Sequence, residues 1–376
     1  MMRGTVQFAG LVTSLVAGLV LCMRTASADA VPKEPSVRVH LRSYAKWERM
    51  VVTGKGQLRV NGAPAAQELK LVRAKDAVLL DGRRYERLAI EASKGVFQLG
   101  SAPSRGRAYA GTLVVDKGRF VTTVPLENYV LGVLRGEIPL KVVPLEAARA
   151  QAIAVRSYTM HYLDQKRPFA DVDDTTLFQV YAGLRYASQD KILRKGVQTT
   201  RGRYLQWENK PLKAFYHSTC GGHTTDVPTG LDRENVGCME GVPCNFCKAS
   251  KYYRWNATLS EASVLRATRL SGRLRAVKIL EKGPGGRVLR VEIETTKAKR
   301  EMHANELRLS IGPSKIRSTR WLSTDASPAG LRIEGAGWGH GVGMCQMGAM
   351  GRAAAGQTAE EILGVYYVGA KIVTAY

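Results

Sequence analysis

The stretch of sequence that most constrains the fold covers residues 124–162 and predicts two helices joined by one short loop: VPLENYVLGVLRGEIPLKVVPLEAARAQAIAVRSYTMHY. Pro125 suits the first position of a helix, and apolar residues follow it at helical spacing: Leu126, Val130, Val133 and Leu134. Pro144 marks the start of a second helix, whose inward line would be Leu145, Ala148, Ala152, Val155, Thr159 and Tyr162. The many alanines of this second helix allow it to pack closely against its neighbours.

Three glutamates in this stretch have different settings. Glu127 and Glu146 each fall in the first turn of a helix, where a carboxylate compensates the unpaired N–H groups and the helix dipole. Glu137 has no such capping role, because it lies between the helices, with Gly136 before it and Pro139 close behind. An apolar setting raises a carboxyl pKa, and a proton held near neutrality is what a general acid needs. From spacing alone, Glu137 could equally be an exposed loop residue.

Four motifs resemble, in their order, those of the stage II sporulation protein D family, also called the amidase-enhancer family. The first is PLENYVLGVLRGEIP followed by PLEAARAQAIAVRSY. The others are DVDDTTLFQVYAG (171–183), AFYHSTCGGHT (214–224) and GWGHGVGMCQMGA (337–349). The resemblance extends from about Tyr109 to the C-terminus.

The resemblance implies an α+β fold, in which a helical catalytic core is packed with β-rich segments and two lobes flank a groove. It also implies that Glu137 is the catalytic acid/base of a peptidoglycan lytic transglycosylase. Such an enzyme cleaves glycan strands between MurNAc and GlcNAc, here strands already stripped of peptides, and leaves 1,6-anhydro-MurNAc ends. The residues carried over to substrate binding are Arg156, Gln179, Tyr181, His217, Gly221, Gly222, Trp338, His340 and Gln346.

Two other classes of protein compete with this interpretation. The main alternative is a non-catalytic, glycan-binding activator that presents strands to a cell-wall amidase, its partner. A binding module of that kind would have no need of an acid at Glu137. A basic envelope protein with a purely structural role would leave the four motifs unexplained.

The charge of the chain narrows the choice of partner. Lys and Arg number 56 against 32 Asp and Glu, a net charge of +24 at pH 7. Such an excess predicts a polyanionic partner: nucleic acid, acidic lipid or an acidic cell-wall polymer. The basic residues form no consecutive block, and the sequence contains no helix-turn-helix or zinc-finger pattern. We therefore expect peptidoglycan glycan strands, and no nucleic acid, as the partner.

The first residues predict export. Arg3 precedes an apolar run over residues 6–21, and Ala26-Ser27-Ala28 offers a small-x-small cleavage site. The run is shorter than the ~20 residues of a membrane-spanning helix. We expect residues 1–28 to be a cleaved signal peptide and the protein to reach the periplasm or cell envelope. An uncleaved membrane anchor is the alternative, and only then would the protein contact a membrane.

The rest of the chain is predominantly strand-like. Short alternating runs over residues 31–120 predict a β-rich N-terminal region, assigned to 29–106. The catalytic domain would cover 107–376, with a mixed β insertion at about 251–333. Residues 204–207 and 212–216 predict a hairpin around Glu208-Asn209-Lys210. Thr358 and Glu361 predict a capping box for the closing helix, and Tyr366-Tyr367 should lie in the core.

Two clusters of potential ligands stand out. Many relatives carry Cys and His, and some bind zinc, where this chain has Asp173, Leu177 and Phe178, so a zinc site there is not expected. The neighbouring aspartates could hold a hard cation, although a polar turn of Asp and Thr side chains is the simpler interpretation. These aspartates are Asp171, Asp173 and Asp174.

A cysteine cluster supplies the other potential ligands: Cys220, Cys238, Cys244 and Cys247. The C-x-x-C spacing of the last two suits a metal ion, with another cysteine and His217 or His223 completing a tetrahedron. Two disulfides are the competing interpretation, and the even number of cysteines and the exported location favour them over a metal. The reaction itself would require no cofactor, so any zinc would be structural.

The last motif is rich in glycine. Alternating glycines over residues 335–343 would let Trp338 and His340 project from a narrow loop towards a sugar. No strand-to-helix context supports a nucleotide-binding interpretation. Relatives often have Ser where Cys345 stands, so we do not expect that residue to be a required nucleophile.

Overall fold

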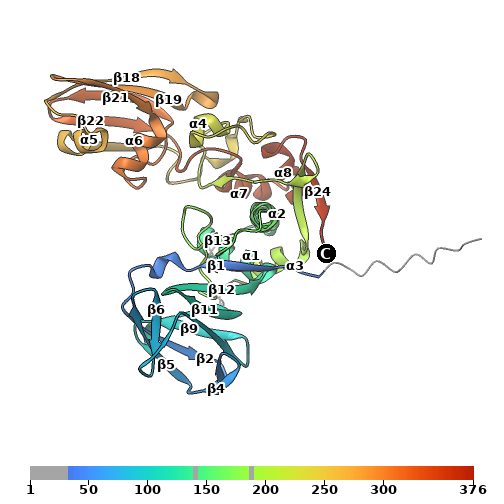
Figure 1. Cartoon of the computed structure of the whole chain (residues 1–376). Coiled ribbons are helices and arrows are strands. Elements are labelled where there is room, and N and C mark those ends of the chain that lie inside the picture. Colours follow the sequence, from blue (N-terminus) through green and yellow to red (C-terminus); the bar gives the residue numbers. More distant parts are fainter. Residues whose placement is uncertain (1–32, 139–142, 186–189) are drawn as a thin grey trace, which may run out of the picture. The chain divides into compact units, whose positions relative to one another are not determined.

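The computed structural model describes residues 33–138, 143–185 and 190–376, so the predicted signal segment 1–28 lies outside the described residues. The fold is mixed α+β with several sheets, as the resemblance implied (Figure 1). By its internal contacts, Lys33–Tyr376 forms one compact unit. Within the described ranges, no helix is both long and apolar enough to cross a membrane. The predicted groove between two lobes stays a prediction.

The N-terminal region consists of short strands, as their alternation predicted. In β8, for example, Leu88, Ile90 and Ala92 are buried while Arg87 and Glu91 are exposed. The strands are β1 Ser36–His40, β2 Arg49–Gly54, β3 Leu58–Val60, β4 Ala63–Ala65, β5 Glu68–Ala74, β6 Ala77–Leu80, β7 Arg83–Tyr85, β8 Arg87–Ala92, β9 Val96–Gly100, β10 Arg107–Ala110, β11 Thr112–Asp116 and β12 Arg119–Pro125. Two short 3-10 helices, η1 Arg42–Tyr44 and η2 Pro103–Arg105, interrupt them.

These strands form two sheets. One has the order β13-β1-β12-β11-β8-β3-β4, and its edge strand β13 (Val172–Asp173) is parallel to β1. The other has the order β10-β9-β2-β5-β6-β7. Strands β9 and β10 pair across the predicted boundary at residue 106, so one sheet includes residues from both sides of it. Strand β12 leads directly into the first long helix.

The two predicted helices are present as α1 (Leu126–Glu137) and α2 (Leu145–Asp164). Helix α1 extends to Glu137, which is its last residue. The prediction that Glu137 lies in the loop between the helices was therefore wrong. Both helices are buried on almost every side, so the predicted inward lines were too narrow. The unpaired N–H groups that begin α1 donate to the Pro35 carbonyl and to the Glu34 carboxylate, each over 2.9 Å.

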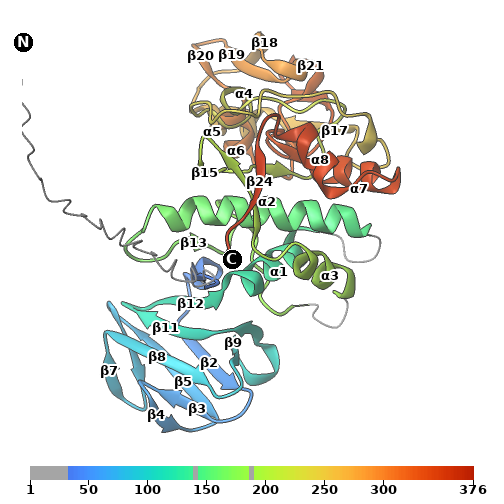
Figure 2. The same cartoon turned by 90° about the vertical axis from the view of Figure 1, so that its right-hand side faces the viewer.

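Helix α2 is buried because it contacts elements from much of the chain. Its neighbours are α1, α3 (Lys191–Thr199), α7 (Gln346–Ala354), α8 (Ala359–Tyr366) and β14 (Arg203–Trp207). Figure 2 shows α2 along its full length. The small side chains of α2 permit this packing: a Cβ on Gly196 of α3 would lie only 2.9 Å from the Ala148 Cβ.

Small sheets carry the segments after α3. A hairpin is present at the predicted turn, with β14 as its first strand. Its second strand is β15 (Lys210–Pro211) and not residues 212–216, so Lys210 belongs to the strand and not to the turn. Strand β24 (Lys371–Thr374) pairs with the other edge of β14. Strands β16 (Tyr216–His217) and β23 (Met344–Cys345) are parallel. Two short helices, α4 (Val227–Leu231) and η3 (Asn245–Cys247), lie between them in the sequence. At α8 the capping box of Thr358 and Glu361 is confirmed, and Tyr366 and Tyr367 are buried as predicted.

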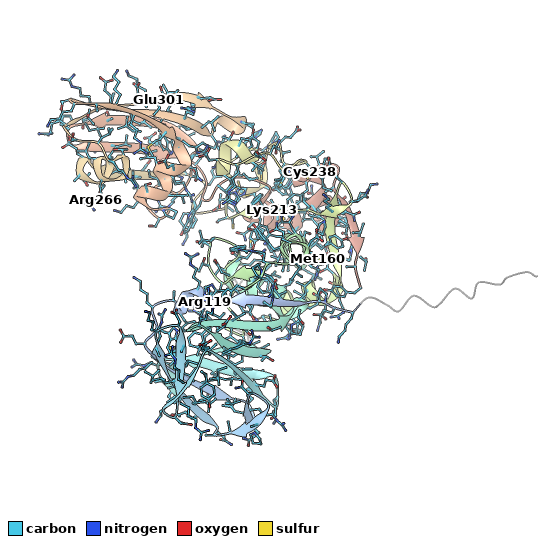
Figure 3. All side chains as sticks on the ribbon, viewed as in Figure 1. Arg119, Met160, Lys213, Cys238, Arg266 and Glu301 are labelled. Atoms are coloured by element: carbon cyan, nitrogen blue, oxygen red, sulfur yellow. The ribbon has the colours of Figure 1, made fainter. Side chains whose placement is uncertain are left out.

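The predicted insertion has a hydrophobic core of its own, built around side chains such as Trp255, Val291 and Trp321. Its sheets have the orders β17-β22-β21 and β18-β19-β20. Its elements are β17 Trp255–Ser260, α5 Glu261–Thr268, β18 Leu274–Lys282, η4 Pro284–Gly286, β19 Val288–Thr295, β20 Lys299–His303, α6 Ala304–Ile311, β21 Trp321–Ser327 and β22 Gly330–Gly335. Charged side chains cover its outer surfaces, among them Arg266 and Glu301 (Figure 3).

Candidate active site

Glu137 occupies the C-terminal end of α1 as a half-buried carboxyl group. Its Oε1 accepts one hydrogen bond, over 2.8 Å, from the backbone N–H of Val180. Burial raises the pKa of Glu137 from the usual 4.5 to about 7, and the Val180 N–H opposes this only in part. The unpaired carbonyls at the end of a helix also disfavour a carboxylate there. Glu137 therefore retains a proton near neutral pH.

Glycines bring α1 into direct contact with the second motif, whose Val180 N–H donates a hydrogen bond to Glu137. A Cβ on Gly136 would lie 2.3 Å from the Val180 carbonyl oxygen, and one on Gly132 would lie 2.3 Å from the Tyr181 ring. The Ala182 N–H donates to the Gly132 carbonyl over 3.0 Å. Residues of the first two motifs thus meet backbone to backbone, which no larger side chain would permit.

Buried polar side chains lie near Glu137. Gln179 accepts hydrogen bonds from Tyr129 Oη (3.3 Å) and Thr159 Oγ1 (3.1 Å) through its Oε1. Tyr181 is buried and stacks on Tyr129, with ring centroids 5.1 Å apart. Gln179 Nε2 and Tyr216 Oη are both buried, and the Gln179 side chain lies close enough to act on the Tyr216 hydroxyl as a hydrogen-bond donor. The Tyr216 hydroxyl proton could then be donated to a substrate group or to water.

Tyr216 is a site residue that the sequence analysis missed. Burial, followed by the charge of Glu137, holds the pKa of Tyr216 well above its usual value. Its hydroxyl therefore stays protonated and can donate a hydrogen bond close to Glu137. Tyr216 lies in the third motif beside His217, so the motif was the available signal. Only the fold brings it to the first motif.

The two histidines join the third and fourth motifs. His340 Nε2 donates to the Tyr216 carbonyl (2.9 Å), and its Nδ1 accepts from the Val342 N–H (3.1 Å). His217 Nδ1 donates to the Val342 carbonyl over 3.1 Å, and its Nε2 is buried without a partner among the described residues. Burial lowers the pKa of His340 to about 3 and that of His217 well below its usual value, so both rings are neutral.

This arrangement differs from the predicted sugar-facing role of His340. Both ring nitrogens of His340 are engaged by backbone groups, which leaves no nitrogen for a sugar hydroxyl. His217 Nε2 remains an available acceptor because Nδ1 carries the proton.

Arg156 also lies differently from the prediction. It is fully buried in α2 and forms a two-pronged ion pair with Glu127, through Nε (2.9 Å) and Nη2 (2.6 Å). Glu127 additionally accepts from the Gly202 N–H and from Tyr376 Oη. Glu127 is thus the centre of a buried network and does not cap α1, while Arg156 is inaccessible to a large substrate.

The remaining predicted residues lie where the third and fourth motifs touch. Thr219 and Trp338 exchange backbone hydrogen bonds of 3.0 and 2.7 Å. Gly221 and Gly222 have φ of 78° and 120°, and a Cβ on Gly221 would lie 2.7 Å from the backbone of residues 336–337. Trp338 is half-buried against the edge of the Tyr252 ring, 4.1 Å between centroids.

Gln346 begins α7 and is buried, with its Nε2 unpartnered among the described residues. It lies directly after β23, which pairs with β16 in the third motif.

The three aspartates of the second motif form a polar turn, as the simpler interpretation predicted. Asp171 pairs with Arg38 over 2.6 Å, and Asp173 accepts from the N–H and hydroxyl of Thr175. Asp174 accepts from the N–H and hydroxyl of Ser43. Their carboxylates are therefore engaged in holding β1 and the loop together.

Four buried cysteines form a cluster that could hold a metal ion: Cys220, Cys244, Cys247 and Cys345. The sulfur atoms lie within 4.8 Å of one another. The prediction named Cys238 in place of Cys345, and the structure corrects it, because β16 and β23 are neighbours only in the folded chain. Cys238 is not a member of the cluster. The cysteines of the described ranges are all free thiols.

Fold and site together define an α+β protein whose candidate acid is a half-buried glutamate at a helix end, beside glycine-rich segments. Residues 116–207 match the family model described as Stage II sporulation protein, and residues 244–343 match a domain of unknown function (DUF8618).

Three relatives extend this finding. The chain is 31% identical over 270 residues to Stage II sporulation protein D of Bacillus amyloliquefaciens, covering 67% of this chain and 75% of the relative. It is 31% identical over 275 residues to an uncharacterized protein of Brachyspira hyodysenteriae, covering 70% of each. It is 27% identical over 300 residues to the amidase enhancer of Bacillus subtilis, covering 65% of this chain and 40% of that protein. The chain therefore belongs to the stage II sporulation protein D (SpoIID) family.

Proposed function

We propose that this protein is an exported lytic transglycosylase that cleaves peptidoglycan glycan strands between MurNAc and GlcNAc, with Glu137 as its acid and base. The observation that carries the proposal is the raised pKa of Glu137, about 7, in a residue that retains partial exposure. A general acid works best when its pKa lies near the working pH. Glu127, at the other end of the same helix, has instead a lowered pKa, because Arg156 pairs with it.

The reaction begins with proton transfer. Glu137, protonated, donates to the glycosidic oxygen as the bond from that oxygen to C1 of the muramic acid breaks. The Glu137 carboxylate then takes the proton of the same muramic acid's C6 hydroxyl as its oxygen bonds to C1. The result is a 1,6-anhydro end and a free hydroxyl on the departing sugar, with no water consumed.

A single carboxylate is sufficient for this route. Ordinary glycosidases need a second one, either as nucleophile or to activate water. The other carboxylates that could take this second role already have partners in the protein. Glu127 pairs with Arg156, Asp171 pairs with Arg38, and Asp174 accepts a hydrogen bond from Ser43. An attack from within the substrate gains through proximity what a second catalytic group would supply.

The neighbouring polar groups would bind and orient the sugar. Tyr216 Oη is a protonated donor close to Glu137, and the Gln179 side chain lies beside it. Trp338, half-buried, offers an aromatic surface of the kind that sugars stack on. The glycines of the third and fourth motifs leave the backbone accessible to a close-fitting strand.

Strands stripped of their peptides are the proposed substrate. Removing the peptides exposes a lactyl carboxylate on every muramic acid, and a chain of net charge +24 attracts such a polyanion. Any metal in the cysteine cluster, zinc by the softness of its ligands, would be structural and take no part in the reaction.

Digestion of purified sacculi tests the proposal. Peptide-stripped sacculi treated with the protein should release fragments that mass spectrometry identifies as anhydro-ended, lighter by one water than reducing ends. Glu137→Gln should lose ~10²–10⁴-fold in rate, because it removes the proton donor. Glu146→Gln is the matched control: it keeps an acceptor for the Ala359 N–H and should remain active. Full activity of Glu137→Gln, or reducing ends in the product, would refute the mechanism.

A second candidate follows from the likeness to a protein named amidase enhancer. In that case this chain would bind glycan strands and activate a cell-wall amidase without cleaving the strands. Unchanged strand length after digestion, together with faster peptide release by an added amidase, would favour it. The Glu137→Gln variant should then accelerate peptide release by the amidase as much as the unchanged protein does.

A further inference from the structure

The cysteine cluster joins three segments that are distant in the sequence. Cys220 follows β16, and Cys345 ends β23. Cys244 immediately precedes η3, and Cys247 is its last residue. All four have no exposed surface. The third and fourth motifs each contribute one cysteine, and the loop between them contributes the other two.

We propose that these four cysteines bind one zinc ion as a tetrathiolate site, with Arg287 as the buried counter-charge. The inference goes beyond the proposed function, because Glu137 is no ligand and the site would exist in a protein without transglycosylase activity.

The geometry of the sulfurs suits a tetrahedral metal. With zinc–sulfur bonds of ~2.3 Å, the sulfurs of a tetrahedron are about 3.8 Å apart. Cys220 and Cys247 have sulfurs 3.4 Å apart, and all the sulfurs fall within 4.8 Å of one another. Cys244 and Cys247 have the C-x-x-C spacing that allows two cysteines to coordinate one metal ion.

Backbone N–H groups point at the sulfurs. The N–H groups of Cys220 and Gly348 each lie 3.2 Å from Cys345 Sγ, and the Gly222 N–H lies 3.4 Å from Cys220 Sγ. Such donors stabilise thiolates in the second shell of metal sites. Cys345 also caps the N-terminus of α7, where the helix dipole favours a negative sulfur.

Arg287 provides independent support. It is fully buried, and among the described residues its Nη1 and Nη2 donate to the carbonyls of Gly339 (3.4 Å) and Cys220 (3.3 Å). Its Nε has no hydrogen-bond partner among the described residues. Two further arginines, Arg308 and Arg320, lie near it as positive charges, and the sulfurs of Cys220 and Cys345 also lie near it.

A buried guanidinium remains charged, and a buried charge without a counter-charge is strongly unfavourable. Zinc with four thiolates carries a net charge of −2, which would compensate Arg287 and one of its neighbours. Four neutral thiols, or two disulfides, would leave this concentration of positive charge uncompensated. The charge balance therefore favours a metal over disulfides.

The metal would fix the segments that line the candidate site. In the β16–β23 ladder, Cys345 is paired with His217, so a ligand lies directly beside a predicted substrate-binding residue. Cys220 immediately precedes Gly221 and Gly222. Arg287, from the insertion, packs against Gly341, where a Cβ would lie 2.2 Å from the guanidinium. One ion would thus hold the third motif, the fourth motif and the 244–247 loop together.

Metal analysis of the full chain, purified without added reductant, tests the site. We expect one zinc per chain after dialysis, and thiols that become reactive only when a chelator removes it. Replacement of zinc by cobalt should give the intense visible bands of a tetrahedral tetrathiolate. A mass lower by four hydrogens with no metal would establish two disulfides and overturn the proposal. Bound iron with its own visible absorption would overturn zinc as the resident metal.

Two single substitutions distinguish the ligand sets. Cys345→Ser should lose the zinc or release it to a chelator much faster, while Cys238→Ser, another buried cysteine, should retain it. The opposite result would overturn the assignment of the fourth ligand. Should Cys345→Ser fail to fold, the cobalt spectrum of the unchanged chain and the metal content of Cys238→Ser still decide the question.

Arg287 has a test of its own. Arg287→Gln should release zinc to a competing chelator faster than the unchanged chain, and Arg287→Lys should restore part of the retention because it keeps the charge. Equal retention in all three proteins would overturn the role of counter-charge. Glu137→Gln should keep its zinc, which separates this proposal from the proposed function.

Discussion

At the scale of single residues, two glutamates of the same helix show how partners decide chemistry. Burial acts to raise the pKa of both Glu127 and Glu137. At Glu127 the hydrogen bonds and charge of Arg156 outweigh burial, and the pKa is lowered. Glu137 has only the Val180 N–H to oppose burial, so its pKa reaches about 7. One is a permanent carboxylate, and the other can exchange a proton at neutral pH.

The raised pKa of Glu137 predicts a cost in stability. Between the unfolded value of 4.5 and the folded value of about 7, the folded protein holds a proton that the unfolded chain has lost. The free energy of unfolding due to this group is therefore greatest below pH 4.5 and falls as pH rises to about 7. Glu137→Gln removes the effect, so above pH 7 the variant should be more stable by about 1–3 kcal/mol, allowing for partial exposure.

Denaturant unfolding of both proteins at pH 5 and pH 8 measures this difference. The stability gained by Glu137→Gln should be larger at pH 8 than at pH 5. Equal effects at the two pH values would mean that Glu137 is already ionised at pH 5 and is no general acid at neutrality. An inactive but more stable variant would also exclude misfolding as the reason for lost activity.

At the scale of elements, the sequence predicted features that depend on a few neighbouring residues. It did not predict contacts between residues that are far apart in the sequence. The helix pair, the hairpin around Glu208 and the capping box at Thr358 are each specified by a few neighbouring residues, and all are present. The membership of Cys345 in the cluster depends on the pairing of β16 with β23, across more than a hundred residues. The burial of Arg156 likewise depends on Glu127, which lies on the other helix.

The contact between α1 and the second motif gives a prediction about Gly136. Gly136→Ala places a methyl group 2.3 Å from the Val180 carbonyl oxygen, and that backbone is fixed by its own hydrogen bonds. The clash should displace the end of α1, with a loss of about 1–3 kcal/mol in stability and a large loss of activity. Thermal unfolding and the sacculus digestion measure the two effects.

Gly364 of α8 provides the matched control. It is also an exposed helical glycine, but a Cβ there would meet nothing within 4 Å. Gly364→Ala should therefore raise stability by about 0.5–1 kcal/mol and leave activity unchanged. If Gly136→Ala behaved like Gly364→Ala, the close approach of α1 to Val180 would not be needed to position Glu137.

At the scale of the whole molecule, basic residues outnumber acidic ones, so ion pairs within the protein cannot neutralise all of the positive charge. On the insertion, for example, Lys278 and Lys299 are matched by Glu292 and Glu294. Over the chain, 56 basic residues face 32 acidic ones, so most of the excess remains available to a partner. Composition predicted this property directly, since it needs no knowledge of the fold.

The charge surplus predicts that binding to glycan strands depends on salt and on the state of the strand. Exposed charges interact over ~30 Å at 0.01 M salt but only ~10 Å at 0.1 M, so the affinity for peptide-stripped strands should fall several-fold over this range. Sedimentation of the inactive Glu137→Gln variant with insoluble sacculi measures binding without cleavage.

Stripped sacculi whose lactyl carboxyl groups have been converted to amides are the control, since they keep the sugar backbone and lose the charge. We expect weak binding to these, with little dependence on salt. Peptide-bearing sacculi should bind less strongly than stripped ones, because each stem peptide replaces a regularly spaced carboxylate by a bulky chain. Equal binding to stripped and amidated sacculi at low salt would show that recognition rests on sugar contacts at the site and owes little to the net charge.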